Sequence, residues 1–168
     1  SYYANMRLGE FRVYDVALNS AEVSKIYSDT KGKYSGIVTQ NLVLHLDAGR
    51  VASYPGSGTS WYDLSGRGNH ATLTNGPTYS SANLGQLIFD GLNDYAPIGF
   101  NGLPVGSSSG TLSGWAKTNT VNGAWRWIVS YGSQYPNQAR FVGINNATYY
   151  FGGYGNDITA TGVQDRKS

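Results

Sequence analysis

The alternation of apolar and polar residues predicts a β-strand near the start of the chain. Between residues 6 and 14, Leu8, Phe11 and Val13 are apolar, and charged residues stand between them. Alternation with a period of two is typical of a strand with one buried face. Gly9 interrupts the alternation, as a glycine does at a β-bulge. We therefore expect a half-buried strand over residues 6–14 with an irregularity at Gly9.

A short helix is predicted directly after this strand. Asn19 is a favourable N-cap residue, and Glu22 stands three residues later, which is the spacing of a capping box. Val23, Ile26 and Tyr27 form one short apolar stripe at helical spacing. Gly32 stands where a left-handed C-cap residue would end the helix. Residues 19–32 are the only convincing helix in the sequence.

Beyond residue 40 the pattern returns to a period of two. Leu42, Leu44 and Leu46 fall on one face of this segment, and His45 and Asp47 fall on the other. Further strands are predicted at residues 86–90, 94–98, 111–117, 125–131, 140–145 and 148–152. Glycine occurs 23 times and marks frequent turns between these strands. Short turns without intervening helices favour an all-β, antiparallel fold over alternating βαβ units.

Composition and charge remove several classes of protein. The absence of cysteine excludes disulfide scaffolds, thiolate metal sites and thiol nucleophiles. The 12 basic and 10 acidic residues are mixed along the chain, so no basic stripe predicts binding to nucleic acid. No apolar run approaches the roughly 18 residues that a membrane span needs. Two histidines and two glutamates leave little material for acid–base catalysis, and we expect no enzyme.

Three sequence blocks carry a resemblance to a known family. They are LVLHLDAG at 42–49, SYPGSGTSWYDLSGRGNHATL at 53–73 and FDGLNDY at 89–95, followed by TLSGWAK at 111–117 and WIVSYG at 127–132. In this order they resemble the laminin-G-like members of the concanavalin A-like lectin/glucanase superfamily, over about residues 40–160. The resemblance implies a concanavalin A-like fold, an antiparallel jelly-roll sandwich of two sheets, with one short helix near the N-terminus.

The order of the family's parts is inverted in this chain. Residues 1–34 resemble the closing strand and helix of a laminin-G-like module, whereas residues 35–168 resemble roughly its front two-thirds and are expected to be incomplete. Residues 1–34 either belong to a preceding module or supply the closing strand of a permuted domain. The composition changes near residue 34, because nine of the 22 charged residues lie before that point.

The segment that follows residue 89 is the candidate site for a cation. Asp90, Asn93 and Asp94 place two carboxylates and an amide within one tight turn. Such oxygen ligands suit calcium, and laminin-G-like domains often carry calcium at a sheet rim. The same residue types also close turns by bonding to their own backbone. Asp63 has the same two interpretations, and we expect it to fix an Asx turn.

Aromatic residues are the candidates for glycan binding, because sugar rings stack on indole and phenol rings. The candidate residues are Trp125, Tyr149, Tyr150, Tyr154 and Asn156. Trp61, Trp115 and Trp127 are expected to pack in the core instead.

No hydrolase signature accompanies these residues. The superfamily's glucanases carry paired carboxylates along one strand, and no Glu-x-Asp-x-x-Glu pattern occurs here. Glu10 and Glu22 are expected to be solvated charges, and His45 and His70 to have structural roles. We therefore expect a non-enzymatic module of an extracellular or virion-surface protein that serves glycan recognition or adhesion. The alternative is a structural module, such as part of a tail fibre or capsid decoration, that binds neighbouring subunits and forms homo-oligomers.

Overall fold

The computed structural model describes residues 5–32, 38–118, 125–133, 135–136, 138–145, 148–153 and 158–160, with the backbone alone for 5, 28–32 and 158–160. They form antiparallel strands and one α-helix, as predicted for an all-β chain. The elements are β1 (Asn5–Tyr14), α1 (Ser20–Gly32), β2 (Leu42–Asp47), β3 (Ser60–Trp61), β4 (Ala71–Thr72), β5 (Thr78–Ser80), the 3₁₀ turn η1 (Ala82–Leu84), β6 (Gln86–Asp90), β7 (Thr111–Thr118), β8 (Arg126–Gly132), β9 (Ala139–Asn145), β10 (Thr148–Gly152) and β11 (Ile158–Ala160).

The first segment of the chain supplies the central strand of a five-stranded sheet. One edge of β1 pairs with β7 from Met6 to Tyr14. The other edge pairs first with β6 and then with β2, and β5 extends the sheet beyond β6. The register of the β1–β7 pair shifts between Leu8 and Glu10, which confirms the predicted irregularity at Gly9. In this chain β1 is therefore hydrogen-bonded to strands from residues 42–118. This pairing holds whether residues 1–34 come from a preceding module or from a permuted domain.

The end of β2 and the start of β6 meet beside Gly9 of β1. The Ala48 amide donates to the Gly9 carbonyl at 2.8 Å. Gly85 has a φ of +102°, and a Cβ placed on it would lie 2.5 Å from the Gly49 Cα atom. Only glycine fits such a close approach of two backbones at a positive φ. This contact allows one edge of β1 to serve two successive partner strands.

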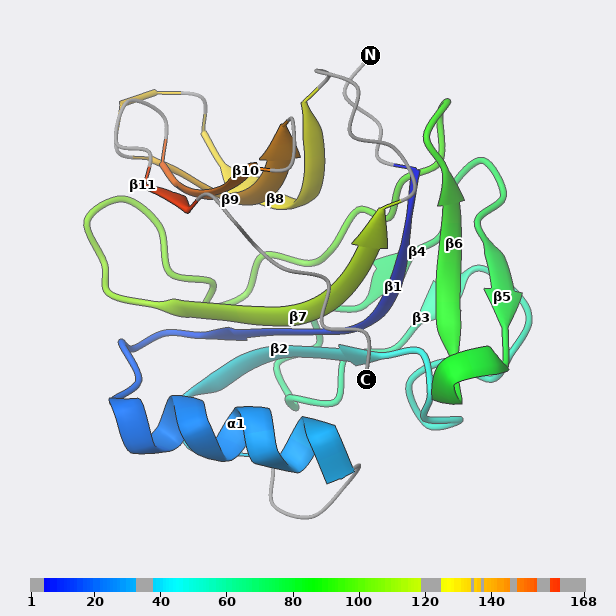
Figure 1. Cartoon of the computed structure of the whole chain (residues 1–168), viewed down its shortest axis with the longest axis horizontal. Helices are drawn as coiled ribbons and strands as arrows, with labels where there is room; N and C mark the ends of the chain where they lie inside the picture. Colours follow the sequence, from blue (N-terminus) through cyan, green and yellow to red (C-terminus); the bar gives the residue numbers. More distant parts are fainter. Residues whose placement is uncertain are drawn as a thin grey trace.

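A second sheet, in the order β11-β10-β9-β8, lies over one face of the first, and α1 lies on the opposite face (Figure 1). Between the sheets, Phe11 and Leu44 from the first sheet belong to the main core together with Tyr131 of β8. Ile128 and Val129 of β8 pack against this core. The structure therefore has two stacked antiparallel sheets with the apolar core between them.

The helix begins as predicted but buries only part of its predicted apolar stripe. The Asn19 side chain accepts from the amides of Ala21 and Glu22, and the Glu22 side chain accepts from the Asn19 amide at 2.8 Å. These bonds confirm the capping box. Of the predicted apolar stripe only Ile26 is buried, in a small cluster with Tyr14 and Leu42, whereas Val23 and Tyr27 are about half exposed. No helix among the described residues is long and apolar enough to cross a membrane.

The predicted strand at 94–98 is wrong. This segment makes only isolated bridges, Thr74 to Tyr95 and Ala71 to Ile98. Pro97 has no N–H to donate, so a continuous ladder cannot form across it. Its carbonyl still accepts from the Thr72 amide at 3.1 Å.

The placement of Trp115 in the core is also wrong, because its side chain is 51% exposed. Leu112 and Ala116 of β7 pack on the core, and Trp115 stands at the opposite phase of the strand, directly across from Glu10. Alternation along a strand therefore turns it away from the core. Trp61 is buried as expected.

Hydrogen bonds from polar side chains hold the loop between β3 and β4 in place. Asp63 accepts from the Ser65 amide at 2.9 Å, which forms the predicted Asx turn, and also from the His45 amide. Asn69 is fully buried and donates to the Val43 and Asn101 carbonyls. His70 accepts from the Asp63 amide through Nδ1, which is the structural role expected for it.

Candidate functional site

Three aromatic side chains from two segments meet on the second sheet. The rings of Trp125 and Trp127 are stacked, with centroids 5.1 Å apart and planes at 19°. Trp125 also lies 4.4 Å from the ring of Tyr150 on β10. All three residues are half-buried. We call Trp125, Trp127 and Tyr150 the aromatic cluster.

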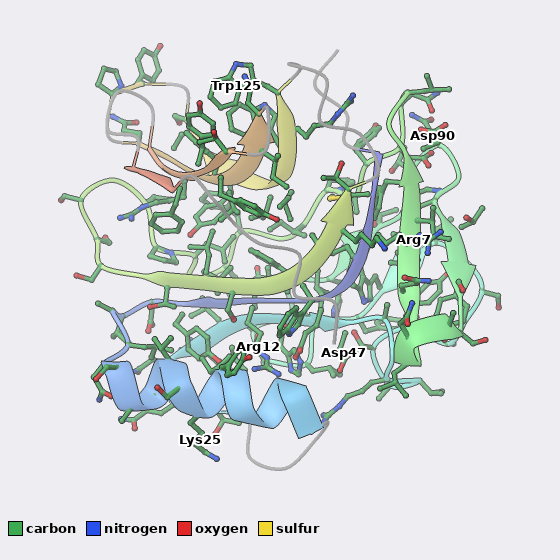
Figure 2. All side chains as sticks on the ribbon, viewed as in Figure 1. Arg7, Arg12, Lys25, Asp47, Asp90 and Trp125 are labelled. Carbon is green, nitrogen blue, oxygen red and sulfur yellow. The ribbon has the colours of Figure 1, made fainter. Side chains whose placement is uncertain are left out.

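A glycine on the middle strand makes room for this cluster. Gly143 of β9 pairs with Trp127 on one side and with Tyr150 on the other, so the three positions share one face of the sheet. A Cβ on Gly143 would lie 2.7 Å from Cε3 of Trp127. The indole therefore lies flat against the strand backbone. Figure 2 shows Trp125 on the side of β8 and β10 that points away from β7.

The other residues predicted for glycan binding are placed differently. Tyr149 is half-buried and pairs with Ile144, so it faces the side opposite Tyr150. Tyr154 and Asn156 lie outside the described residues. The structure brings together Trp125 and Tyr150 from the predicted set and adds Trp127, which the sequence predicts to pack in the core. A glycine opposite two aromatic residues is the signal that could have found this arrangement, but only once the strand register is known.

The predicted calcium residues close a turn after β6. Asp90 accepts from the Leu92 amide at 2.8 Å, and Asp94 accepts from the Asp90 amide at 3.0 Å. The bond from the Leu92 amide is the main reason that the pKa of Asp90 lies below its usual value. Asn93 is exposed, and Asp94 is buried. These backbone bonds fit an Asx-type turn, and a role in calcium binding stays a prediction.

A polar cluster joins β1 to β2 on the face that carries α1, and sequence reasoning missed it. His45 Nε2 donates to Glu10 at 2.9 Å, and the Arg12 guanidinium pairs with the same carboxylate. The Asp47 carboxylate lies 3.6 Å from Nε of Arg50. The Glu10 side chain is only 15% exposed, so the expectation of a solvated charge is wrong. Figure 2 shows Arg12 and Asp47 in the layer between β2 and α1.

The environment shifts the pKa values of both carboxyl groups. Burial alone would raise the pKa of Glu10, but the hydrogen bond from His45 and the charge of Arg12 hold it below its ordinary value. Burial raises the pKa of Asp47, and the neighbouring Glu10 charge adds to this effect. The pKa of Glu10 therefore lies below its ordinary value, and that of Asp47 lies above its ordinary value.

Three of these residues have the spacing of metal ligands. Glu10, His45 and Asp47 each offer one ligand atom, and these atoms lie within 4.8 Å of one another. However, Arg12 already pairs with Glu10, and Arg50 lies beside Asp47. A divalent cation would therefore leave an uncompensated positive charge in a buried site, which is costly. The arrangement fits an ion-pair network that fastens β1 to β2 better than it fits a metal centre.

A cavity of about 550 Å³ lies between the two sheets. Its walls are mostly apolar, with Phe11 and Leu46 from the first sheet and Ile128 and Val129 from β8. Exposed residues border the cavity, so it opens to solvent, and its volume lies within the range of small-molecule sites. This inter-sheet cavity is therefore the second candidate site.

Comparison of the chain with protein-family models, with curated proteins and with solved structures found no match in any of the three.

Proposed function

We propose that this chain is a non-enzymatic, laminin-G-like jelly-roll module that recognises glycans through the aromatic cluster, as part of an extracellular or virion-surface protein. The observation that carries the proposal is the group of Trp125, Trp127 and Tyr150 packed around Gly143. The order of the sequence blocks supports the jelly roll, as do the two stacked antiparallel sheets.

The cluster has the chemistry that sugar recognition requires. Apolar C–H faces of a pyranose ring pack on aromatic rings, and a few polar groups orient the hydroxyls. The rings of Trp125 and Trp127 are held by mutual stacking, so little side-chain entropy is lost when a ligand binds.

A glycan array with the full chain tests this proposal. We expect saturable binding to a defined subset of glycans, and a loss of at least about tenfold in affinity for Trp125→Ala and Tyr150→Ala, because each removes a stacking surface. Trp115→Ala is the matched control, since it removes an exposed indole from the other sheet. The absence of any hit, or an equal loss for the control variant, would refute glycan recognition at this cluster.

The edge of β7 that the described strands leave unpaired and the exposed tryptophan on β7 favour a second function, which is assembly with other protein chains. Among the described residues β7 pairs only with β1, so its other edge is open, and Trp115 is exposed on it. Open strand edges and exposed aromatic rings are features of protein–protein contacts. If the chain serves assembly, the isolated protein should form oligomers that Trp115→Lys dissociates, as measured by light scattering after size-exclusion chromatography. A monomer over the whole concentration range would exclude this function for the chain alone.

A further inference from the structure

We propose that the inter-sheet cavity binds an alkyl chain that ends in a hydroxyl or ammonium group. This site is separate from the glycan proposal, although Trp127 borders both places. Three features of the cavity favour such a ligand, namely its apolar walls, its volume and the charge at its rim.

The walls of the cavity come from both sheets and offer no hydrogen bonds along most of their length. Leu44 and Leu46 of β2 belong to the buried core beneath it, and Phe89 of β6 lines one side. Ile128 and Val129 of β8 form the wall that the second sheet contributes. Aliphatic and aromatic walls of this kind favour hydrocarbon over water or sugar, because polar groups inside would lose their hydrogen bonds.

The volume is too large for a packing defect and suits a ligand. An apolar cavity of about 150 Å³ already stays dry and binds benzene. The inter-sheet cavity holds about 550 Å³, which lies within the range of small-molecule sites. It is bordered by exposed residues, namely Tyr95, Pro97 and Ser130, which provide a way in from solvent.

The charge at the rim of the cavity determines which end group a bound ligand can carry. Asp94 lines the cavity, and its side chain is almost fully buried. One of its oxygens accepts from the Asp90 amide, and among the described residues no basic side chain forms an ion pair with it. A buried carboxylate attracts hydrogen-bond donors and repels anions. The site should therefore accept an alcohol or amine and reject a fatty-acid carboxylate.

Fluorescence of N-phenyl-1-naphthylamine, an uncharged apolar probe, tests the site in the full chain. We expect saturable enhancement that 1-dodecanol and dodecylamine reverse, with dodecanoate at least about tenfold weaker. Asp94→Asn should bring dodecanoate to within about threefold of dodecanol, because it removes the repelling charge while keeping an oxygen for the Asp90 amide. Ala96→Phe should abolish probe binding, because Ala96 lines the cavity and the new ring would fill it. Ala82→Phe is the control, since Ala82 is exposed in η1, away from the cavity.

Three results would overturn the proposal. The first is that the parent protein melts cooperatively but binds no probe, and that Ala96→Phe has a lower melting temperature. The two sheets would then be packed against each other with no room for a ligand. The second is equal effects of Ala96→Phe and Ala82→Phe, which would place the probe elsewhere. The third is that dodecanol and dodecanoate compete equally in both the parent protein and Asp94→Asn. Asp94 would then not discriminate between the end groups of ligands.

Discussion

Removing the Glu10 carboxylate should destabilise the fold strongly, because two buried groups depend on it. Arg12 is 4% exposed, and its Nε and Nη1 atoms have no hydrogen-bond partner among the described residues, where Glu10 is the anionic group paired with it. His45 is 2% exposed and donates to the same oxygen. Breaking a buried ion pair by deleting one partner costs about 3–5 kcal/mol. Since Glu10 retains some exposure, we expect about 3 kcal/mol for Glu10→Ala.

Thermal and urea unfolding of Glu10→Ala provide the assay. A loss of about 3 kcal/mol corresponds to a fall of roughly 6–12 °C in melting temperature for a domain of this size. Glu22→Ala is the control, because it removes the other glutamate of the chain from an exposed capping box and should cost about 1 kcal/mol or less. Equal effects of the two variants, or a Glu10→Ala effect below about 1 kcal/mol, would refute the view that the network fastens β1 to β2.

The same network predicts the direction of a pH effect. The pKa of Glu10 is lowered in the folded state, so its contribution to stability is present above about pH 4.3, the ordinary pKa of a glutamate. That contribution is lost as the pH falls through the lowered, folded-state value. The stability difference between the parent protein and Glu10→Ala should therefore shrink on acidification. A difference that stays constant from neutral pH down to about pH 3 would contradict this assignment.

Two further predictions concern single positions. Gly85→Ala should prevent cooperative folding or lower the melting temperature by more than Glu10→Ala does. The reason is that a Cβ at this position would lie 2.5 Å from the Gly49 Cα atom, on a backbone with a φ of +102°. If thermal unfolding shows the stability of the parent protein, the close contact between the end of β2 and the start of β6 is refuted. Burial raises the pKa of Tyr131 to about 12, so its folded form binds its proton more tightly than the unfolded chain does. Stability should therefore fall from about pH 10 towards pH 12, and Tyr131→Phe should remove that part of the alkaline loss in urea titrations.

Local features were predictable because they depend on neighbours in sequence. Asn19 and Glu22 are three residues apart, and their reciprocal bonds form within a single turn of helix. Gly9 interrupts an alternating segment, and the register shifts at that point. The Asx turn at Asp63 is similarly local. Each of these predictions needed no knowledge of what lies on the other side of the sheet.

The candidate sites could not be predicted in the same way, because they depend on register between distant strands. Glu10 meets His45 only because β1 and β2 pair with a particular register, and nothing in either segment alone specifies it. Trp115 is exposed because its phase on β7 is set by pairing with β1. Trp127 joins Tyr150 because Gly143 stands between them.

The amino-acid pattern alone determined the class of this chain: antiparallel strands, one capped helix and many turns, because period and capping act within a few residues. The tertiary structure decided that β1 occupies the middle of the sheet, that charges gather on the face that α1 covers and that a cavity lies between the two sheets. These outcomes follow from which strands pair and how the sheets stack. A shift of one residue in either register would turn every side chain of that strand to the other face.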